Sequence, residues 1–258
     1  MNQSAKNYGI CLQTYAPIRR EPNERTEMLT QLLFGDSIEI LDDKGKWLFV
    51  KILFDNYEGW VDKKCIDLSV GPADVAFLVF KNNLSLKNIS TGQKVVAAIG
   101  CSIPEINDNK FALGNEQFKL EDSSKLLLPG DITHLDAAIE EVVSLPYLWG
   151  GKSGFGFDCS GLVQYLARVI GVDISRDASE QADEGTTLSF INEAQKGDLA
   201  FFDDTEGLIH HVGMMLGNGK IIHASGIVRI DSIDHQGIFN NKTGAYTHRL
   251  RVVKRIIK

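Results

Sequence analysis

The sequence predicts an α+β protein in which an all-β N-terminal half precedes a mixed C-terminal half. Short segments of alternating apolar and polar residues dominate the first half, as at 37–41 and 47–52. Over 135–143, apolar residues recur at the spacing of an α-helix. A second amphipathic stretch with this spacing follows Cys159. The sequence divides into three expected domains, at residues 1–70, 71–130 and 131–258.

The first domain is predicted from a succession of short strands. Segments 37–41 and 47–52 flank a polar turn at 43–46, and a strand ending in Gly-Trp-Val at 59–61 follows. Gly71-Pro72 is the expected boundary between the first domain and the segment that follows it. Beyond it the strand pattern is weaker, so a second barrel and a β extension of the first domain are both open.

Cys159 is the most informative residue, because a glycine-rich loop turns into a helix there. Apolar residues recur after it at helical spacing: Leu162, Val163, Leu166, Val169 and Ile170. Unpaired N–H groups and the helix dipole at such a position favour negative charge and lower the pKa of a thiol. Cys159 is therefore a candidate nucleophile for covalent catalysis. On its placement alone, a buried cysteine at the start of a helix is an equal alternative.

A predicted β-hairpin supplies partners for this cysteine, with a turn around Asn218-Gly219 between His211 and His223. A two-residue turn would place the two histidines on opposite faces. A three-residue loop would pair Leu216 with Lys220 and Gly213 with His223, which makes the histidines diagonal neighbours on one face. His211 would then take the thiol proton and His223 would orient it. His210 points the other way and is expected to be structural.

Five ordered blocks carry a resemblance to a known family. They are YLWGG at 147–151 with DCSGL at 158–162, RDASEQ at 176–181, GDLAFF at 197–202, HVG at 211–213 and HAS at 223–225. Together they resemble the NlpC/P60 family of bacterial cell-wall cysteine peptidases. The resemblance implies a papain-like catalytic domain whose triad maps onto Cys159, His211 and His223. The N-terminal strand order resembles the bacterial SH3-like barrel, so one or two such barrels are expected before it.

The same resemblance implies a substrate. It suggests hydrolysis of the bond between γ-D-glutamate and a diamino acid, in murein peptides with a free L-alanine, during peptidoglycan recycling. A free ammonium in a closed pocket needs a carboxylate partner. The substrate-binding residues implied are Tyr57, Tyr147, Asp158, Ser160 and Asp177, with Glu21 or Glu24 from the barrel. Ordinary packing or helix capping is the alternative for Tyr57, Tyr147 and Asp177, and Arg176 is expected to pair with a buried carboxylate.

Two other function classes compete with this interpretation. An N-acetylmuramoyl-L-alanine amidase, or an acyltransferase of related fold, would keep the Cys159 chemistry. A wall-binding protein without activity would not need the intact set of Cys159, His211 and His223.

The composition of the chain argues against some classes of binding partner. The net charge of −7 argues against nucleic acid or an anionic membrane as the main partner. No apolar run reaches the roughly 20 residues of a membrane helix, and no secretory signal is visible, so a cytoplasmic location is expected. The four cysteines are widely spaced, which favours thiols over a metal site or a disulfide. We expect a monomer that acts on a small peptide, without cofactor or metal.

Overall fold

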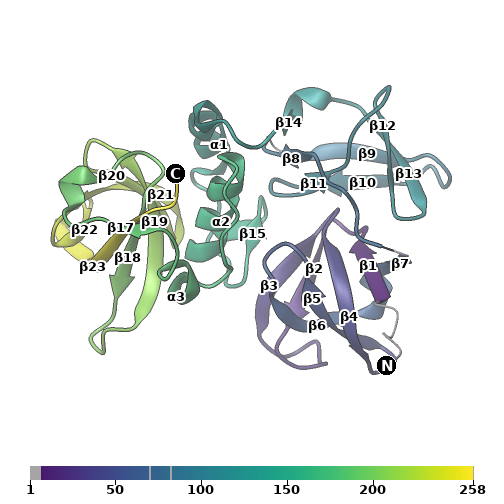
Figure 1. Ribbon diagram of the computed structural model, residues 1–258, viewed down its shortest axis with the longest axis horizontal. Coiled ribbons are helices and arrows are strands. Elements are labelled where there is room, and N and C mark those ends of the chain that lie inside the picture. The colour runs from purple at the N-terminus through teal and green to yellow at the C-terminus, as the bar shows by residue number, and fades with distance from the viewer. Residues whose placement is uncertain (1–6, 70, 82, 258) are drawn as a thin grey trace. The chain divides into compact units, whose positions relative to one another are not determined.

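The computed structural model describes residues 7–69, 71–81 and 83–257. The chain divides into two compact units, Met1–Pro129 and Gly130–Lys258. Figure 1 shows a strand-rich N-terminal unit and a C-terminal unit that combines helices with a curved sheet. The α+β class predicted from the sequence is confirmed.

The N-terminal unit begins with one seven-stranded sheet. Its strands are β1 (Asn7–Cys11), β2 (Tyr15–Arg19), β3 (Met28–Leu33), β4 (Ser37–Asp43), β5 (Trp47–Ile52), β6 (Glu58–Asp62) and β7 (Ile66–Ser69), in the spatial order β3-β2-β6-β5-β4-β1-β7. The predicted hairpin is the pair β4 and β5, and Gly45 takes a positive φ of 77° in its turn. Alternate residues such as Ile18, Val50 and Val61 point into a shared apolar core.

The rest of this unit forms two smaller sheets. One has the order β10-β9-β13-β12 and the other β11-β8-β14. Their strands are β8 (Phe77–Val79), β9 (Leu84–Asn88), β10 (Lys94–Ala97), β11 (Ser102–Ile103), β12 (Lys110–Leu113), β13 (Glu116–Leu120) and β14 (Leu126–Leu127). Phe34 from the first part packs edge-on against Phe118, with ring centroids 5.2 Å apart, so the two parts share a core.

The C-terminal unit places helices against a sheet that closes on itself. The helices are α1 (Leu135–Val142), α2 (Cys159–Val169) and α3 (Ala178–Gln181), and β15 (Lys152–Ser153) pairs with β16 (Gly156–Phe157). The sheet contains β17 (Thr186–Thr187), β18 (Leu199–Asp203), β19 (Ile209–Gly217), β20 (Lys220–Ser225), β21 (Ile227–Asp234), β22 (Gly237–Asn240) and β23 (Ala245–Arg255). Its order is β17-β23-β18-β19-β20-β21-β22, and β23 also pairs with β22, which closes a six-stranded barrel.

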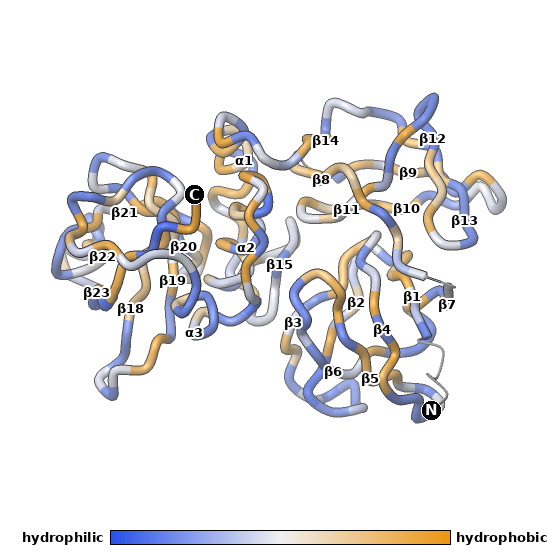
Figure 2. Tube along the Cα trace, in the orientation of Figure 1, coloured by the Kyte–Doolittle hydropathy of each residue, from blue (hydrophilic) through white to orange (hydrophobic). Residues whose placement is uncertain are grey.

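Helix α2 is the element that positions the predicted nucleophile. It packs on β19 and β20 and is buried along most of its length, as the stripe from Leu162 onward predicts. Gly171, with a φ of 76°, ends it. Figure 2 shows hydrophobic residues along α2 and the barrel strands and hydrophilic ones at many of the turns. Within the described ranges, no helix has the length and apolarity needed to cross a membrane.

The four cysteines are thiols, as the sequence predicts. Cys11, Cys101 and Cys159 are buried, and Cys65 is half-buried.

Candidate active site

Cys159 is the first residue of α2, and Asp158 is its N-cap. The Asp158 carboxylate accepts a hydrogen bond from the Gly161 N–H at 2.7 Å, which satisfies one of the free donors of the first turn. The Cys159 sulfur accepts hydrogen bonds from the backbone N–H groups of Val212 and Ser160. The first of these comes from β19, so the sulfur lies beside the strand that carries His211.

A buried ion pair fixes the loop before α2. The Arg176 guanidinium, 1% exposed, binds Asp158 through both oxygens, at 3.0 and 2.6 Å, and donates to Ser160 Oγ at 2.8 Å. Asp158 also accepts from the Gly150 N–H at 2.9 Å. The expectation that Arg176 pairs with a buried carboxylate is confirmed. These bonds give Asp158 and Ser160 a structural role, and their contact with substrate stays a prediction.

The hairpin combines features of the two predicted registers. Gly217 pairs with Lys220 across a two-residue turn in which Asn218 and Gly219 have φ values of 50° and 64°. A bulge at Leu216 then shifts the register, so that Gly213 pairs with His223. The pairing of Gly213 with His223 is therefore confirmed. The expected pairing of Leu216 with Lys220 is wrong, because the extra residue sits in the strand and not in the turn.

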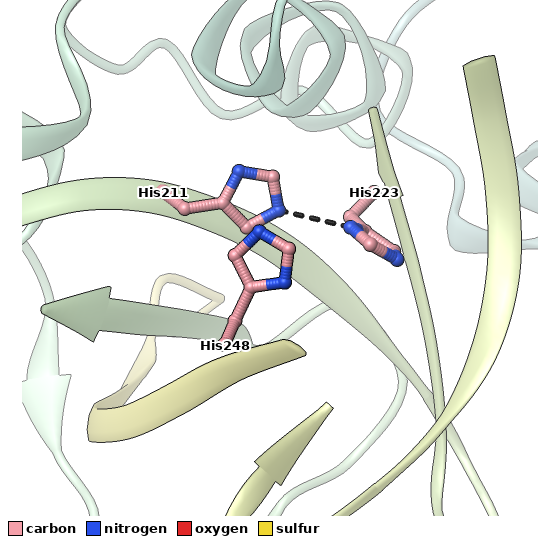
Figure 3. A group of neighbouring side chains, drawn as sticks. All are labelled: His211, His223 and His248. Carbon is pink, nitrogen blue, oxygen red and sulfur yellow. Dashed lines mark hydrogen bonds between the residues drawn. The ribbon is translucent and has the colours of Figure 1, made fainter. Parts of the chain in front are cut away.

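This register brings the two histidines together. His211 Nε2 lies 2.9 Å from His223 Nδ1, and both rings are buried. Figure 3 shows the two rings on neighbouring strands with these nitrogens facing each other. The bond leaves Nδ1 of His211 as the nitrogen that can take a proton from Cys159. His210, one position earlier, is exposed.

Two residues of this cluster are not apparent from the sequence. Asp231, on β21, accepts a bond at 3.1 Å from Nε2 of His223. His248, on β23, stacks on His211 with ring centroids 4.1 Å apart and planes 24° apart, as Figure 3 shows. Both lie outside the catalytic blocks in sequence, and neither lies in a recognisable motif. Asp231 reaches the site because β21 pairs with β20, and His248 because β23 and β19 both pair with β18.

The histidines also offer nitrogen donors to a metal. One nitrogen each from His211, His223 and His248 lie within 4.8 Å of one another, and imidazole suits zinc and copper. An imidazole lone pair lies in its ring plane, however, and the His211 and His248 rings are stacked. Their lone pairs therefore run side by side, and one ring would have to rotate before both bound one ion.

Two other predicted substrate residues lie in this unit. Tyr147 is half-buried and close enough for Cys159 and Asp158 to perturb the pKa of its hydroxyl. Asp177 is half-buried at the N-cap position of α3, but its side chain makes no capping hydrogen bond with that helix. Helix capping therefore does not account for the Asp177 carboxylate.

Tyr57, Glu21 and Glu24 lie in the N-terminal unit. Tyr57 is half-buried just before β6 and packs against the core of the first sheet. Glu21 and Glu24 are exposed on the turn between β2 and β3, and the Glu24 carboxylate is in an ion pair with Lys46. Their contact with substrate stays a prediction.

Comparison with protein families assigns a domain in each unit. Residues 144–247 match the NlpC/P60 family. The C-terminal unit is an NlpC/P60 domain, so the chain carries the catalytic domain of a cysteine peptidase. Residues 18–66 match the bacterial dipeptidyl-peptidase SH3 domain, so the resemblance seen in the N-terminal strands is also confirmed.

Relatives share both the NlpC/P60 domain and the region before it. The chain is 28% identical to the gamma-D-glutamyl-L-lysine dipeptidyl-peptidase of Bacillus subtilis over 76% of its own length and 71% of the relative. It is also 28% identical to the protein of that name from Bacillus cereus, over 84% of its length and 74% of the relative. A crystal structure of an NlpC/P60 family protein from Bacillus cereus matches 97% of this chain and 100% of that chain with a TM-score of 0.82. At 21% identity, this last match supports the fold.

The electrostatics of the NlpC/P60 site correct one expectation. Burial raises the pKa of the Cys159 thiol to about 11, and the Asp158 carboxylate adds to the shift. Burial also lowers the pKa of His211 well below its ordinary 6.5, with further contributions from His248, His223 and His210. The lowered thiol pKa predicted from the helix N-terminus is wrong for the resting site, since desolvation outweighs the helix dipole. Both shifts favour the neutral forms, a thiol at Cys159 and an uncharged imidazole at His211, in the resting site.

We predict the pH dependence of alkylation from these directions. Iodoacetamide reacts with thiolate, so its rate with Cys159 should rise by about tenfold per pH unit from pH 7 to 10 without a plateau. Cys11, which is also buried and whose pKa burial also raises, serves as the internal control and should likewise show no plateau in this range. Mass spectrometry of each cysteine peptide gives the four rates. A plateau for Cys159 below pH 8 would instead indicate a thiolate–imidazolium pair.

Proposed function

We propose that this peptidase hydrolyses the bond between γ-D-glutamate and a diamino acid in short murein peptides that begin with a free L-alanine. We further propose that it does so in the cytoplasm, on fragments released from the wall. The hydrogen-bonded pair on β19 and β20, with His211 Nε2 2.9 Å from His223 Nδ1, carries the proposal together with Cys159 at the start of α2. The names of the two Bacillus relatives, which share the SH3 and catalytic regions, support this choice of bond.

Acylation begins with a neutral pair. Cys159 Sγ attacks the carbonyl carbon of the γ-glutamyl bond while His211 Nδ1 removes the thiol proton. The Tyr147 hydroxyl, whose pKa burial raises to about 12, stays protonated and can donate to the developing oxyanion. The imidazolium of His211 then gives its proton to the departing amine of the diamino acid. The carbon–nitrogen bond breaks and a γ-glutamyl thioester on Cys159 remains.

Deacylation uses the same groups in reverse order. His211, neutral again, removes a proton from a water molecule that attacks the thioester carbonyl. The carbon–sulfur bond breaks, His211 returns the proton to the Cys159 sulfur, and the dipeptide leaves with a γ-carboxyl group that loses its remaining proton to solvent. His223 remains hydrogen-bonded to His211 at 2.9 Å in both steps and fixes the ring.

We assign recognition of the substrate ammonium to Asp177. Its half-buried carboxylate is close in sequence to Arg176, which bonds Asp158 and Ser160, yet it does not cap α3. Asp158 is less suited, because both of its oxygens already bond Arg176. Substrate binding by Tyr57, and by Glu21 or Glu24, stays a separate prediction for the SH3 domain.

The test compares L-Ala-γ-D-Glu-diamino acid peptides with free and acetylated N-termini. Once the bound peptide covers the half-buried Asp177 carboxylate, leaving it without a charged partner costs several kcal/mol, so kcat/KM should favour the free peptide by about a hundredfold or more. Mass spectrometry should find the dipeptide L-Ala-D-Glu as product. Equal rates on both peptides would contradict the amine site, and cleavage at the sugar–peptide link would indicate an amidase.

Variants test which residue sets the preference for the peptide with a free N-terminus. Asp177→Asn should reduce the preference for the free peptide, whereas Asp183→Asn, in an acid two residues beyond the short helix α3, should leave it unchanged. Tyr57→Phe tests the contribution of the SH3 domain. A preference that survives in Asp177→Asn would remove Asp177 from the site.

A further inference from the structure

A chain of hydrogen bonds crosses three strands of the barrel and ends on an ion pair. It runs from His211 to His223 at 2.9 Å and from His223 to Asp231 at 3.1 Å. Arg229 then holds Asp231 through Nε at 2.7 Å and through its terminal nitrogen at 2.9 Å. His211, His223 and Asp231 are each 5% exposed or less. Buried polar groups of this kind are normally all hydrogen-bonded, so the loss of one bond in the chain leaves a buried group unsatisfied.

The register explains why these side chains line up. Gly213 pairs with His223, and Ile221 pairs with Asp231. Directly opposed residues share a face, as do residues two apart on one strand. His211, His223 and Asp231 therefore lie on one face, as successive diagonal neighbours on β19, β20 and β21.

Each bond in the chain fixes the direction of the next one. Two guanidinium nitrogens face the carboxylate of Asp231, so it can only accept from His223. Burial acts to raise the pKa of Asp231, but bonds from Arg229 and His223 outweigh it and hold that pKa below its usual value. Nε2 of His223 must then carry a proton. A neutral imidazole has one N–H, so Nδ1 of His223 is an acceptor.

The same argument applies one residue further along. Because His223 Nδ1 accepts, Nε2 of His211 must donate. The lone pair of His211 is thereby placed on Nδ1, the nitrogen left for Cys159. When Nδ1 takes the thiol proton, His211 still donates through Nε2 and no bond has to be rearranged.

We propose that Asp231 is a positioning residue that sets the tautomer of the catalytic base from two side chains away. Arg229 directs the carboxylate, and His223 transmits its preference to His211. The inference rests on the proposed peptidase mechanism of this site. It extends the three-residue set predicted from sequence to a relay whose far end is a carboxylate.

The test uses a double-mutant cycle on kcat with the free L-Ala-γ-D-Glu-diamino acid peptide. In the otherwise unchanged enzyme, Asp231→Ala should lower kcat roughly 10- to 100-fold with little change in KM, as is typical when a supporting hydrogen bond to a site histidine is lost. His223→Asn places an amide oxygen near the position of Nδ1, and this oxygen can accept from His211 without help. In that background Asp231→Ala should change kcat less than about twofold.

Two controls separate positioning from structure. Asp234→Ala removes a carboxylate on the same strand that bonds Tyr246 and not His223, so it should leave kcat unchanged. Equal losses from Asp231→Ala in both backgrounds would indicate a structural role and overturn the proposal, as would no loss in the wild-type background.

Nitrogen-15 NMR of the imidazole rings tests the relay without any substrate. His211 should carry its proton on Nε2 in the unmodified protein and become a mixture of tautomers in Asp231→Ala. A protein that shows this shift but does not cleave the peptide would refute the substrate and not the relay. Unchanged His211 tautomers in Asp231→Ala would refute the relay itself.

Discussion

Replacing Cys159 by serine is expected to lower kcat/KM by roughly ten-thousand-fold or more, while the fold survives. Burial holds the pKa of His211 well below 6.5, so its neutral imidazole is a weak base. It can remove the proton of a thiol during attack, but a hydroxyl is far less acidic and would not be activated. Serine is also close in size to cysteine, so it can keep the hydrogen bonds from Val212 and Ser160.

The same experiment includes His211→Ala and the double variant. Because the thiol and the imidazole act as one unit, each single change should remove nearly all turnover, and the double variant should be no worse than either. His210→Ala is the matched control, since His210 adjoins His211 on β19 but is exposed. A large loss from His210→Ala, or near-normal turnover in Cys159→Ser, would contradict this assignment of the site.

The nucleophile could be predicted because its setting is local. Glycines before Cys159, a helical stripe after it and Gly171 at its end are all within one stretch of chain. The structure places Cys159 at the first residue of α2 and a φ of 76° at Gly171. Neither feature depends on distant residues, so the pattern of side chains was sufficient.

The hairpin register could be narrowed to two alternatives, and the structure combines them. Turn chemistry at Asn218-Gly219 favours a two-residue turn, while catalysis requires Gly213 opposite His223. The bulge at Leu216 satisfies both conditions. A bulge leaves no clear mark in a single sequence, because any residue type can be the extra one.

Residues that reach the site through tertiary structure could not be predicted. Asp231 arrives on β21, the strand after that of His223, and His248 arrives on β23, two strands further on. The sequence predicted the wrong direction for the pKa shift of Cys159 for a related reason. The burial of the thiol and the charge of Asp158 beside it are properties of the packed unit. Local position predicts the helix dipole, whereas desolvation requires the whole fold.

Arg176→Met is expected to destabilise the catalytic unit by about 3–5 kcal/mol. The guanidinium is 1% exposed and binds both oxygens of Asp158. Without it, a buried carboxylate keeps the N–H groups of Gly150 and Gly161 but loses the positive charge that compensates its own. Arg176→Lys should recover only part of the loss, because an ammonium cannot form the bidentate contact.

An exposed pair of the same kind is the control for this prediction. Arg20 and Glu27 form an ion pair in which the side chains are 62% and 35% exposed. Arg20→Met should therefore change the stability far less than Arg176→Met does. Hydrogen exchange of the α2 amides, measured in increasing denaturant, reports on the catalytic unit separately from the SH3 domain.

Combining Arg176→Met with Asp158→Asn shows whether the loss comes from the unpaired charge. An asparagine can accept from the Gly161 N–H, as Asp158 does at 2.7 Å, without the cost of a buried charge. The double variant should thus be more stable than the sum of the two single losses predicts. Gly161 packs closely on Gly151, and a Cβ at position 161 would lie 2.2 Å from the Gly151 carbonyl oxygen. The loop therefore has little room to shift once the unpaired charge is removed. Strictly additive losses would mean that the guanidinium acts by filling space and not by neutralising Asp158.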